Sequence, residues 1–394
     1  MKIPTFNKIR AYFYSFFWLF LTYLLAPYFY FLIFLANFPY RGKKNKELKI
    51  LVIQSGKIGD LVCTTPVFRE IKKKFPLVHL TALIMSKSKG VLENNPRIDE
   101  ITLITDYISI NDKLRLLSKL RKEKYDWVFN LLPDSFTNII AFWSLVPNRV
   151  STTYKYSGEI IGLLSFFSNY RLEYKRHTSL MKHYLNLFKF IGIKESSEKR
   201  EIFIQADEEK KASDFLKTQN LNSTDLLIGM SVTAGVKLKE WAPSRFASLA
   251  DKLIEEKNAK IIFIGSADDR SRIEKVQKMM QNTSINTSGR FKLSELPALL
   301  KKLKLFISVD TGPLYIADTL GVPVVDIVGP VDVNELYPLN TQSRIVQKKI
   351  YCVPCTYMFY VPRFCKEGHL RCLKDITPEE VFDAAISLIN TNSS

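Results

Sequence analysis

The sequence lacks the motifs of several common protein classes. No G-x-G-x-x-G follows a strand-like segment, no stretch has Walker A spacing, and no helix-turn-helix, RNP or zinc-finger pattern is present. No Asp-x-Asp pair stands in a loop, and repeats and low-complexity tracts are missing. These absences argue against a dehydrogenase and against a nucleic-acid-binding protein, and they leave no obvious site for a catalytic metal.

Acidic residues are few compared with basic ones. The 394 residues include 57 Lys and Arg but only 39 Asp and Glu, which gives a formal net charge of +18. This excess suggests an anionic partner, and a membrane surface carrying phosphorylated glycolipid fits better than nucleic acid. A generally solvated basic surface is the alternative. The length exceeds that of a single hydrophobic core, so we expect two domains.

The segment from Ala11 to Phe38 contains no charged residue and is crowded with Phe, Tyr, Trp and Leu. It is long enough to cross about 30 Å of hydrocarbon, so we expect a membrane anchor over residues 1–45. A signal peptide fits less well, because the apolar run is too long and no A-x-A cleavage pattern follows. Pro27 lies near the middle, and both a spanning helix and a broken, re-entrant one remain open.

Basic residues flank this anchor on both sides, with more on the C-terminal side. They are Lys2, Lys8 and Arg10 before it, and Arg41, Lys43, Lys44, Lys46 and Lys49 after it. The positive-inside rule therefore predicts that the rest of the chain lies at the cytoplasmic face of the membrane.

Beyond residue 48, apolar runs alternate with amphipathic stretches, which predicts a doubly wound α/β fold. The first Rossmann-like domain is expected over residues 46–200, with strands at 49–53, 79–84, 100–104 and 127–132. A polar connection follows over 194–225. The pattern restarts over 225–375, with strands at 226–230, 260–265 and 305–309, and a C-terminal helix is expected over 376–394.

Two strand ends carry the chemistry. Asp310-Thr311-Gly312-Pro313 follows the last of these strands and predicts a tight turn into a helix, with a carboxylate at the strand end and bare N–H groups at the helix N-terminus. Such a terminus binds phosphate, so this turn is a candidate cradle for a nucleotide diphosphate. After the first strand, Gly56-Lys57-Ile58-Gly59-Asp60 predicts a second tight loop, in which Asp60 could simply favour the first helical turn.

Both segments resemble signatures of glycosyltransferase family 9, the lipopolysaccharide heptosyltransferase family. The run from Asp310 to Ala317, with Gly321-Val322-Pro323 and Gly329-Pro330, resembles the family's donor signature, and Ser55 to Pro66 resembles its opening loop. The resemblance covers residues 48–385. It implies the GT-B architecture, in which two Rossmann-like domains face each other across a cleft, and it implies no cofactor.

The resemblance also implies roles for individual residues. Asp60 would be the general base that deprotonates the acceptor hydroxyl, and Lys239, in Lys-Glu-Trp-Ala-Pro, would contact the donor phosphates, although a Lys beside Trp is most often a surface residue. Asp269 would grip the nucleoside. The remaining donor-binding candidates are Gly59, Ser231, Thr233, Asp310, Thr311, Gly312 and Tyr315; at position 315 the family commonly has His.

The four cysteines Cys352, Cys355, Cys365 and Cys372 form a C-x2-C pair and a looser pair. A cytosolic location disfavours disulfides, so a structural metal site and buried thiols are the alternatives, and neither concerns catalysis. Cys63, in the first loop, is expected to be a small packing residue.

We therefore expect an inverting, membrane-associated glycosyltransferase. It would move a sugar, with heptose from ADP-heptose as the expected donor, onto a lipid-linked glycan such as the lipopolysaccharide core. The alternative is a membrane-bound protein that binds nucleotide sugars without turnover, and Tyr315 is the main support for it.

Overall fold

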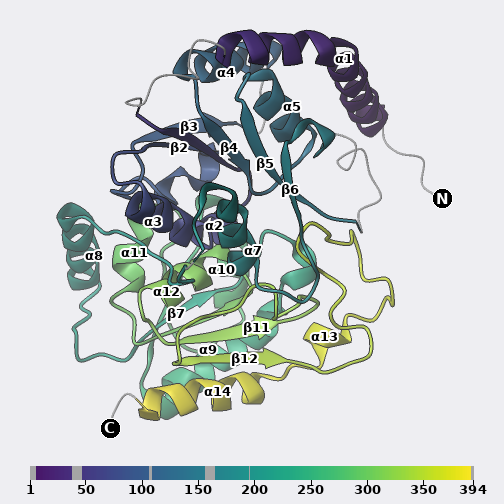
Figure 1. The fold of residues 1–394 in the computed structure, drawn as a ribbon. Helices are drawn as coiled ribbons and strands as arrows, with labels where there is room; N and C mark the ends of the chain where they lie inside the picture. Colours follow the sequence, from purple (N-terminus) through teal and green to yellow (C-terminus); the bar gives the residue numbers. More distant parts are fainter. Residues whose placement is uncertain (1–5, 38–46, 106–108, 156–164, 195, 392–394) are drawn as a thin grey trace.

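The computed structural model describes residues 6–37, 47–105, 109–155, 165–194 and 196–391. Two six-stranded parallel sheets lie one above the other with helices around them (Figure 1). This is the GT-B arrangement of two facing Rossmann-like domains, so the expected fold class is confirmed. The exact domain boundaries stay predictions.

The first sheet forms the N-terminal domain and has the strand order β3-β2-β1-β4-β5-β6. Its strands are β1 (Lys49–Gln54), β2 (His79–Met85), β3 (Glu100–Ile104), β4 (Trp127–Asn130), β5 (Asn148–Thr153) and β6 (Tyr170–Glu173). Its helices are α2 (Ile58–Val62), α3 (Thr65–Lys74), α4 (Ile110–Glu123), α5 (Ser135–Trp143) and α7 (Leu180–Leu187). The four strands expected from the sequence are present, and β5 and β6 extend the sheet.

The second sheet forms the C-terminal domain, with the order β12-β11-β10-β7-β8-β9. Its strands are β7 (Leu227–Ser231), β8 (Lys260–Phe263), β9 (Ile285–Asn286), β10 (Leu305–Val309), β11 (Val324–Val328) and β12 (Ser343–Gln347). Its helices are α8 (Ala206–Thr218), α9 (Pro243–Lys257), α10 (Arg270–Gln277), α11 (Leu296–Leu300), α12 (Gly312–Thr319), α13 (Arg371–Lys374) and α14 (Pro378–Thr391). Every residue of β7, β10 and β11 is buried, as expected for central strands covered on both faces.

The two domains are packed tightly against each other. One hydrophobic cluster contains Ile50 and Val52 of β1 together with Leu314 and Tyr315 of α12. The carboxyl ends of both sheets meet at this interface, and α2 contacts α12 there. Residues that follow β1 and β10 are therefore brought together although they lie far apart in the sequence.

The polar connection between the domains contributes a buried ion pair. Arg200 is 4% exposed, and its Nη1 donates to Asp318 Oδ2 of α12 at 2.8 Å. Its Nη2 donates to the carbonyl oxygen of Tyr337 at 2.6 Å. Because removal of one partner would leave the other charge buried and unpaired, this pair fixes the connection against α12.

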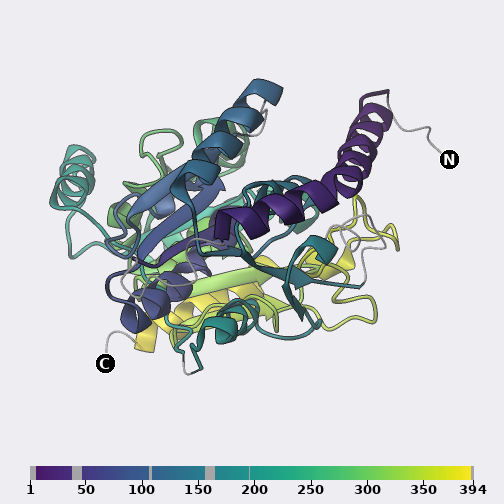
Figure 2. The same ribbon diagram turned by 45° about the horizontal axis from the view of Figure 1, so that its top comes forward.

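A single helix, α1 (Phe6–Asn37), occupies most of the expected anchor. Phe38, Lys2, Arg41, Lys43, Lys44 and Lys46 lie outside the described residues. The stretch Phe16–Leu35 is long and apolar enough to cross a membrane, by length and composition. In Figures 1 and 2 the longer, C-terminal part of the helix lies along the N-terminal domain beside α5, and its N-terminal part turns away from the domain. Leu19, Ala26 and Phe29 are buried in this contact.

A buried histidine on α7 predicts acid sensitivity. His183 is 7% exposed, its Nε2 lies 3.0 Å from the Thr152 hydroxyl, and burial lowers its pKa to about 4. An unfolded His titrates near pH 6.5, so between about pH 6.5 and 4 the unfolded chain binds the proton first. The free energy of unfolding should therefore fall by up to about 3 kcal/mol across this range.

The measurement is denaturant unfolding at several pH values, with His183→Gln as the comparison because it removes the titrating group. The wild type should lose more stability than His183→Gln on acidification. Equal losses in the two proteins would contradict the assignment.

Candidate active site

Asp60 lies in the first turn of α2, directly after the loop that joins β1 to this helix. Its carboxylate folds back under the loop, and Oδ2 accepts a hydrogen bond from the Lys57 N–H at 2.8 Å. A Cβ at Gly56 would lie 2.6 Å from the Asp60 Cβ, so only glycine fits there. The Ser55 hydroxyl donates to the carbonyl oxygen of Leu132 at 3.0 Å and attaches the loop to the end of β4. The loop thus holds Asp60 in a defined, half-buried place.

The surroundings of Asp60 make it a stronger base than an ordinary carboxylate. Burial raises its pKa most, and the nearby Asp310 raises it further, while the Lys57 N–H and the charges of Lys239 and Lys57 lower it. The net direction is upward. A raised pKa brings a carboxylate closer to the range in which a general base works best.

Opposite Asp60, Asp310 follows β10 and is 6% exposed. Its Oδ2 forms an ion pair with Lys239 Nζ at 2.6 Å, and its Oδ1 accepts a hydrogen bond from the Tyr315 hydroxyl at 2.5 Å. Burial alone would lower the pKa of Lys239, but the charge and hydrogen bond of Asp310, together with the charge of Asp60, raise it above its ordinary value. Lys239 is therefore a cation, and Asp310 holds it in place.

Asp326 is a member of this group that the sequence analysis missed. It lies inside β11, is 1% exposed, and its Oδ1 has no hydrogen-bond partner among the described residues. Burial and the charge of Asp310 raise its pKa well above the ordinary value, although Lys239 partly lowers it, and the net shift favours the protonated form. The available signal was an acidic residue inside the apolar run Val324–Val328.

The second lysine of the site connects the domains. Lys57 Nζ donates to the carbonyl oxygen of Gly235, in the loop after β7, at 2.9 Å. Burial and the charge of Lys239 lower its pKa, and Asp60 partly offsets them. Asp60, Lys57, Lys239, Asp310 and Asp326 thus act on one another electrostatically across the domain interface.

Gly312 and Gly59 allow the two domains to approach closely. A Cβ at Gly312 would lie 2.5 Å from Ile58 Cγ2, and one at Gly59 would lie 3.2 Å from Tyr315 Cδ2. Tyr315 is 1% exposed, so it offers almost no surface to a ligand and acts through Asp310. Gly312 was expected to bring backbone close to phosphate, whereas the space beside it is filled by Ile58. Phosphate binding by Thr311 and Gly312, at the start of α12, stays a prediction.

The other donor-binding candidates lie at the same edge of the second sheet. Ser231 ends β7, and both Ser231 and Thr233 are buried. Asp269, after β8, uses Oδ2 to accept hydrogen bonds from the Ser266 N–H at 2.8 Å and the Ser266 hydroxyl at 2.7 Å. This carboxylate therefore caps its own turn, and contacts of the three residues with a nucleotide stay predictions.

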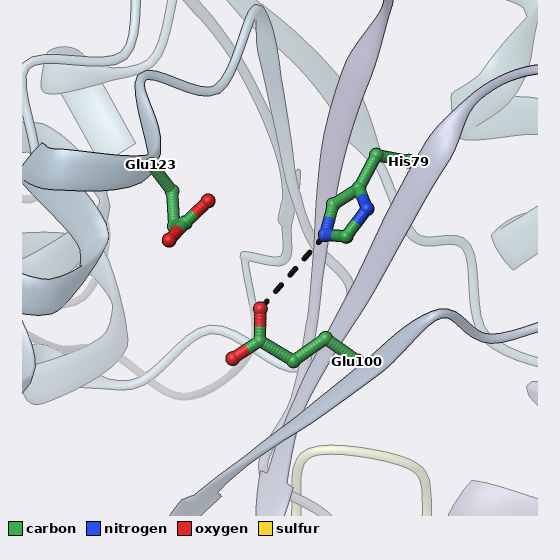
Figure 3. A group of neighbouring side chains, drawn as sticks. All are labelled: His79, Glu100 and Glu123. Atoms are coloured by element: carbon green, nitrogen blue, oxygen red, sulfur yellow. Dashed lines mark ion pairs between the residues drawn. The ribbon is translucent and has the colours of Figure 1, made fainter.

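A cluster of His79, Glu100 and Glu123 could hold a metal ion by the proximity of its ligand atoms (Figure 3). His79 and Glu100 are the first residues of β2 and β3, at the opposite sheet edge from Asp60. Lys119 pairs with Glu100 at 2.6 Å and Lys49 pairs with Glu123 at 3.1 Å. The lysines already neutralise these carboxylates, so the cluster is explained as a set of surface ion pairs.

The cysteines fall into two groups. Burial raises the pKa of Cys63 to about 12, so this thiol is protonated and packs inside the N-terminal domain, as expected. Cys352, Cys355, Cys365 and Cys372 line one cavity of about 70 Å³ in the C-terminal domain. None of the five forms a disulfide.

Comparison with known proteins relates the chain to one family of glycosyltransferases. The family model "Glycosyltransferase family 9 (heptosyltransferase)" matches residues 113–359, which include Lys239, Asp269 and Asp310 but not Asp60. The chain is 26% identical to lipopolysaccharide heptosyltransferase 2 of Salmonella typhimurium, over 87% of this chain and 99% of that relative. It is 25% identical to lipopolysaccharide core heptosyltransferase OpsX of Haemophilus influenzae, over 78% of this chain and 86% of that relative.

Two solved structures share the fold. A glycosyltransferase of family 9 from Veillonella parvula superimposes with a TM-score of 0.74 at 25% identity, over 87% of this chain and 97% of that one. The ADP-heptose lipopolysaccharide heptosyltransferase II of E. coli superimposes with a TM-score of 0.70 at 21% identity, over 88% of this chain and 100% of that one. The curated relatives and the structures are therefore covered over most of their length.

Because α2 and α12 approach closely, adding a methyl group at Gly312 or Gly59 should destabilise the fold to different extents. Gly312→Ala should lower the free energy of unfolding by roughly 1–3 kcal/mol, the usual cost of overpacking, because the new Cβ would collide with Ile58. Gly59→Ala should cost less, because its Cβ would meet the Tyr315 ring at 3.2 Å. Denaturant unfolding measures both, and a larger loss for Gly59→Ala would contradict the packing argument.

Proposed function

Because the chain belongs to glycosyltransferase family 9, we propose that this glycosyltransferase moves heptose from ADP-heptose onto a lipid-linked glycan of the lipopolysaccharide core. The names of the relatives support heptose and lipopolysaccharide, and the E. coli structure is described as an ADP-heptose enzyme. The observation that carries the proposal is the meeting of Asp60 with the Lys239–Asp310 pair at the interface of the two sheets.

We further propose a single displacement. An acceptor hydroxyl gives its proton to Asp60 while its oxygen forms a bond to the anomeric carbon. The bond from that carbon to the diphosphate breaks, and the diphosphate leaves with the electron pair. Attack from the side opposite the leaving group inverts the anomeric configuration. The raised pKa of Asp60 supports its role as the base.

The departing diphosphate needs positive charge. Lys239 supplies a fixed cation, because its ion pair with Asp310 sets the position of Nζ before the donor arrives. The N-terminus of α12, at Gly312, lies two residues beyond Asp310 and offers backbone N–H groups. Together these groups support a leaving-group site built from the protein itself.

A binding protein without turnover was the alternative, and Tyr315 was its main support. The Tyr315 hydroxyl donates to Asp310, so a hydrogen-bond donor to this carboxylate is present at the position where the family commonly has His. The substitution therefore leaves the Lys239–Asp310 pair supported, and it favours an active enzyme.

Asp60→Asn tests the general base. The amide has the same shape but cannot accept the proton, so turnover should fall by roughly a hundredfold or more while ADP affinity changes little. Release of ADP from ADP-heptose with a lipopolysaccharide-core acceptor measures turnover, and isothermal titration measures affinity. Asp214→Asn, on α8, is the matched control and should be unchanged, because this side chain is 49% exposed and pairs with Lys210 of the same helix. Near-normal turnover of Asp60→Asn would remove Asp60 from the mechanism.

For the acceptor, we propose that α1 binds the cytoplasmic face of the membrane and lies in its plane. One face of the helix packs on the N-terminal domain, where Trp18 and Phe29 contact Trp143 with ring centroids 5.4 and 5.2 Å apart. Tyr30 contacts Phe142 further along. These contacts extend over about 18 Å of helix, whereas a perpendicular span would carry most of that length away from the domain into lipid.

The opposite face of α1 is also apolar but is exposed. We call it the outer stripe; it consists of Phe16, Phe17, Phe20, Leu24, Tyr28, Phe31, Phe34 and Leu35, each at least 48% exposed. This spacing keeps the stripe on one side of the helix. An exposed apolar surface of this size needs a partner, and lipid suits an uncharged aromatic helix in a strongly basic chain.

An apolar cavity beside the helix supports the same orientation. It has a volume of about 300 Å³ and is lined by Trp18 of α1, Leu114 and Leu117 of α4, and Phe136, Ile139 and Trp143 of α5. The N-termini of α4 and α5 follow β3 and β4, so they lie at the same sheet edge as the Asp60 loop. An acyl chain in this cavity would hold a lipid-linked acceptor near the catalytic edge.

Charge reversal in the outer stripe tests membrane binding. Leu24→Glu with Phe31→Glu should lower the fraction bound to anionic vesicles by at least about tenfold, because each lost apolar side chain contributes roughly 1.5–3 kcal/mol. Leu77→Glu, at an 86% exposed apolar residue on the body, is the control and should bind normally. Equal binding of the two variants would contradict the proposed surface. If an N-terminal tag and the two sheet domains were found on opposite sides of the vesicle membrane, α1 would be a spanning helix instead.

A further inference from the structure

The side chain of Lys57 crosses the interface between the two domains. Lys57 precedes α2 in the N-terminal domain, and its Nζ donates to the carbonyl oxygen of Gly235 in the C-terminal domain at 2.9 Å. A Cβ at Gly235 would lie 2.9 Å from this Nζ and 3.2 Å from the lysine Cδ, so glycine leaves the room that the lysine stem occupies. The interface is thus crossed by a cation that ends on an uncharged backbone oxygen.

This oxygen leaves the charge of Lys57 without a counter-ion. Lys239 forms an ion pair with Asp310 at 2.6 Å, whereas no carboxylate among the described residues forms one with Lys57. Burial lowers the pKa of Lys57 most, and the positive charge of Lys239 lowers it further. The ammonium group keeps further N–H donors for other acceptors. Because it is attracted more strongly to a charged phosphate oxygen than to a carbonyl, an anion between the two lysines would bind both and relieve their repulsion.

The surroundings of this ammonium group indicate which anion fits. Gly235 lies in the loop after β7, between the donor-binding candidate Thr233 and Lys239, the proposed leaving-group cation. The Lys57 N–H donates to Asp60 Oδ2 at 2.8 Å, so the same residue contacts the proposed base. In a single displacement, the acceptor oxygen and the anomeric carbon lie between the base and the diphosphate. The phosphate nearest to the Asp60 loop is therefore the one that carries the sugar.

We propose that Lys57 is a second cation for the donor diphosphate, and that its ammonium group leaves the Gly235 carbonyl to bind the phosphate that carries the sugar. This inference rests on the proposed function, because it requires a nucleotide-diphosphate donor. The flexible lysine stem lets Nζ change its acceptor without movement of the backbone. The leaving group would then be held by Lys239 from one domain and by Lys57 from the other. Negative charge on the diphosphate grows as the glycosidic bond breaks, so Lys57 stabilises the transition state more than the bound donor.

Lys57→Met tests this role, because methionine keeps much of the apolar stem and removes the charge. Isothermal titration in EDTA, where no divalent cation takes the place of the lysine, should show ADP affinity lowered at least about tenfold and AMP affinity nearly unchanged. The kcat for transfer should fall by roughly a hundredfold, and KM should change less. Lys57→Arg keeps the charge and should recover most of the ADP affinity. Lys257→Met is the matched control and should behave like the wild type, because Lys257 is exposed at the end of α9, which leads to the opposite edge of the sheet.

The outcomes separate the role of Lys57 from the identity of the donor. Equal ADP affinity of the wild type and Lys57→Met would overturn the proposal. An equal loss of affinity for ADP and AMP would also overturn it, because Lys57 would then only join the domains. If the wild type bound no ADP, the proposed donor would be wrong, and inorganic diphosphate would replace ADP in the comparison. Weaker binding of inorganic diphosphate by Lys57→Met would then support the role of the lysine, and equal or absent binding would overturn it.

Discussion

The carboxylate of Asp310 is the group on which the site depends. It lies at the end of a fully buried strand, with Lys239 on one oxygen and the Tyr315 hydroxyl on the other. Loss of this carboxylate would leave a buried cation and a buried hydroxyl without their partner, which is far more costly than loss of a surface ion pair. Tyr315 in turn meets Gly59 of α2, so one carboxylate orders residues that belong to both domains.

The charges around Asp310 also suit an anionic ligand. Asp60 and Asp310 face Lys57 and Lys239, and burial raises the pKa of the third carboxyl group, on Asp326, which favours its neutral form. Two carboxylates and two lysines balance, so a diphosphate does not meet an excess of negative charge. An ionised Asp326 would add a third negative charge and remove that balance. Burial of Asp326 inside β11 therefore affects the charge of the site as well as the packing of the sheet.

The sequence predicted those parts of the fold and site that depend on local pattern. Asp60 and Asp310 each follow an apolar strand, and glycine-containing turns mark the start of α2 and α12, so both were found. Strand β5 was not predicted, because its residues Asn148 to Thr153 are mostly polar and show no apolar run. Arg149 is nevertheless buried in this strand, where its guanidinium donates hydrogen bonds to the carbonyl oxygens of Phe167 and Val146. The role of Gly312 could not be predicted, because Ile58, the residue that requires it, is more than two hundred positions away. Whether α1 packs on the body was likewise undetermined, since both of its faces are apolar.

The packing of α1 on α5 has a consequence for biogenesis. The ribosome makes α1 first, and α5 follows about a hundred residues later, which takes roughly 5–20 s at ordinary rates of synthesis. During that interval the face of α1 that later contacts Trp143 and Phe142 has no protein partner. The nascent helix can reach lipid before its own domain exists. If α1 binds the membrane as proposed, the catalytic domains would assemble against a helix already at the membrane, and translation itself would deliver the enzyme to the surface that holds the proposed acceptor.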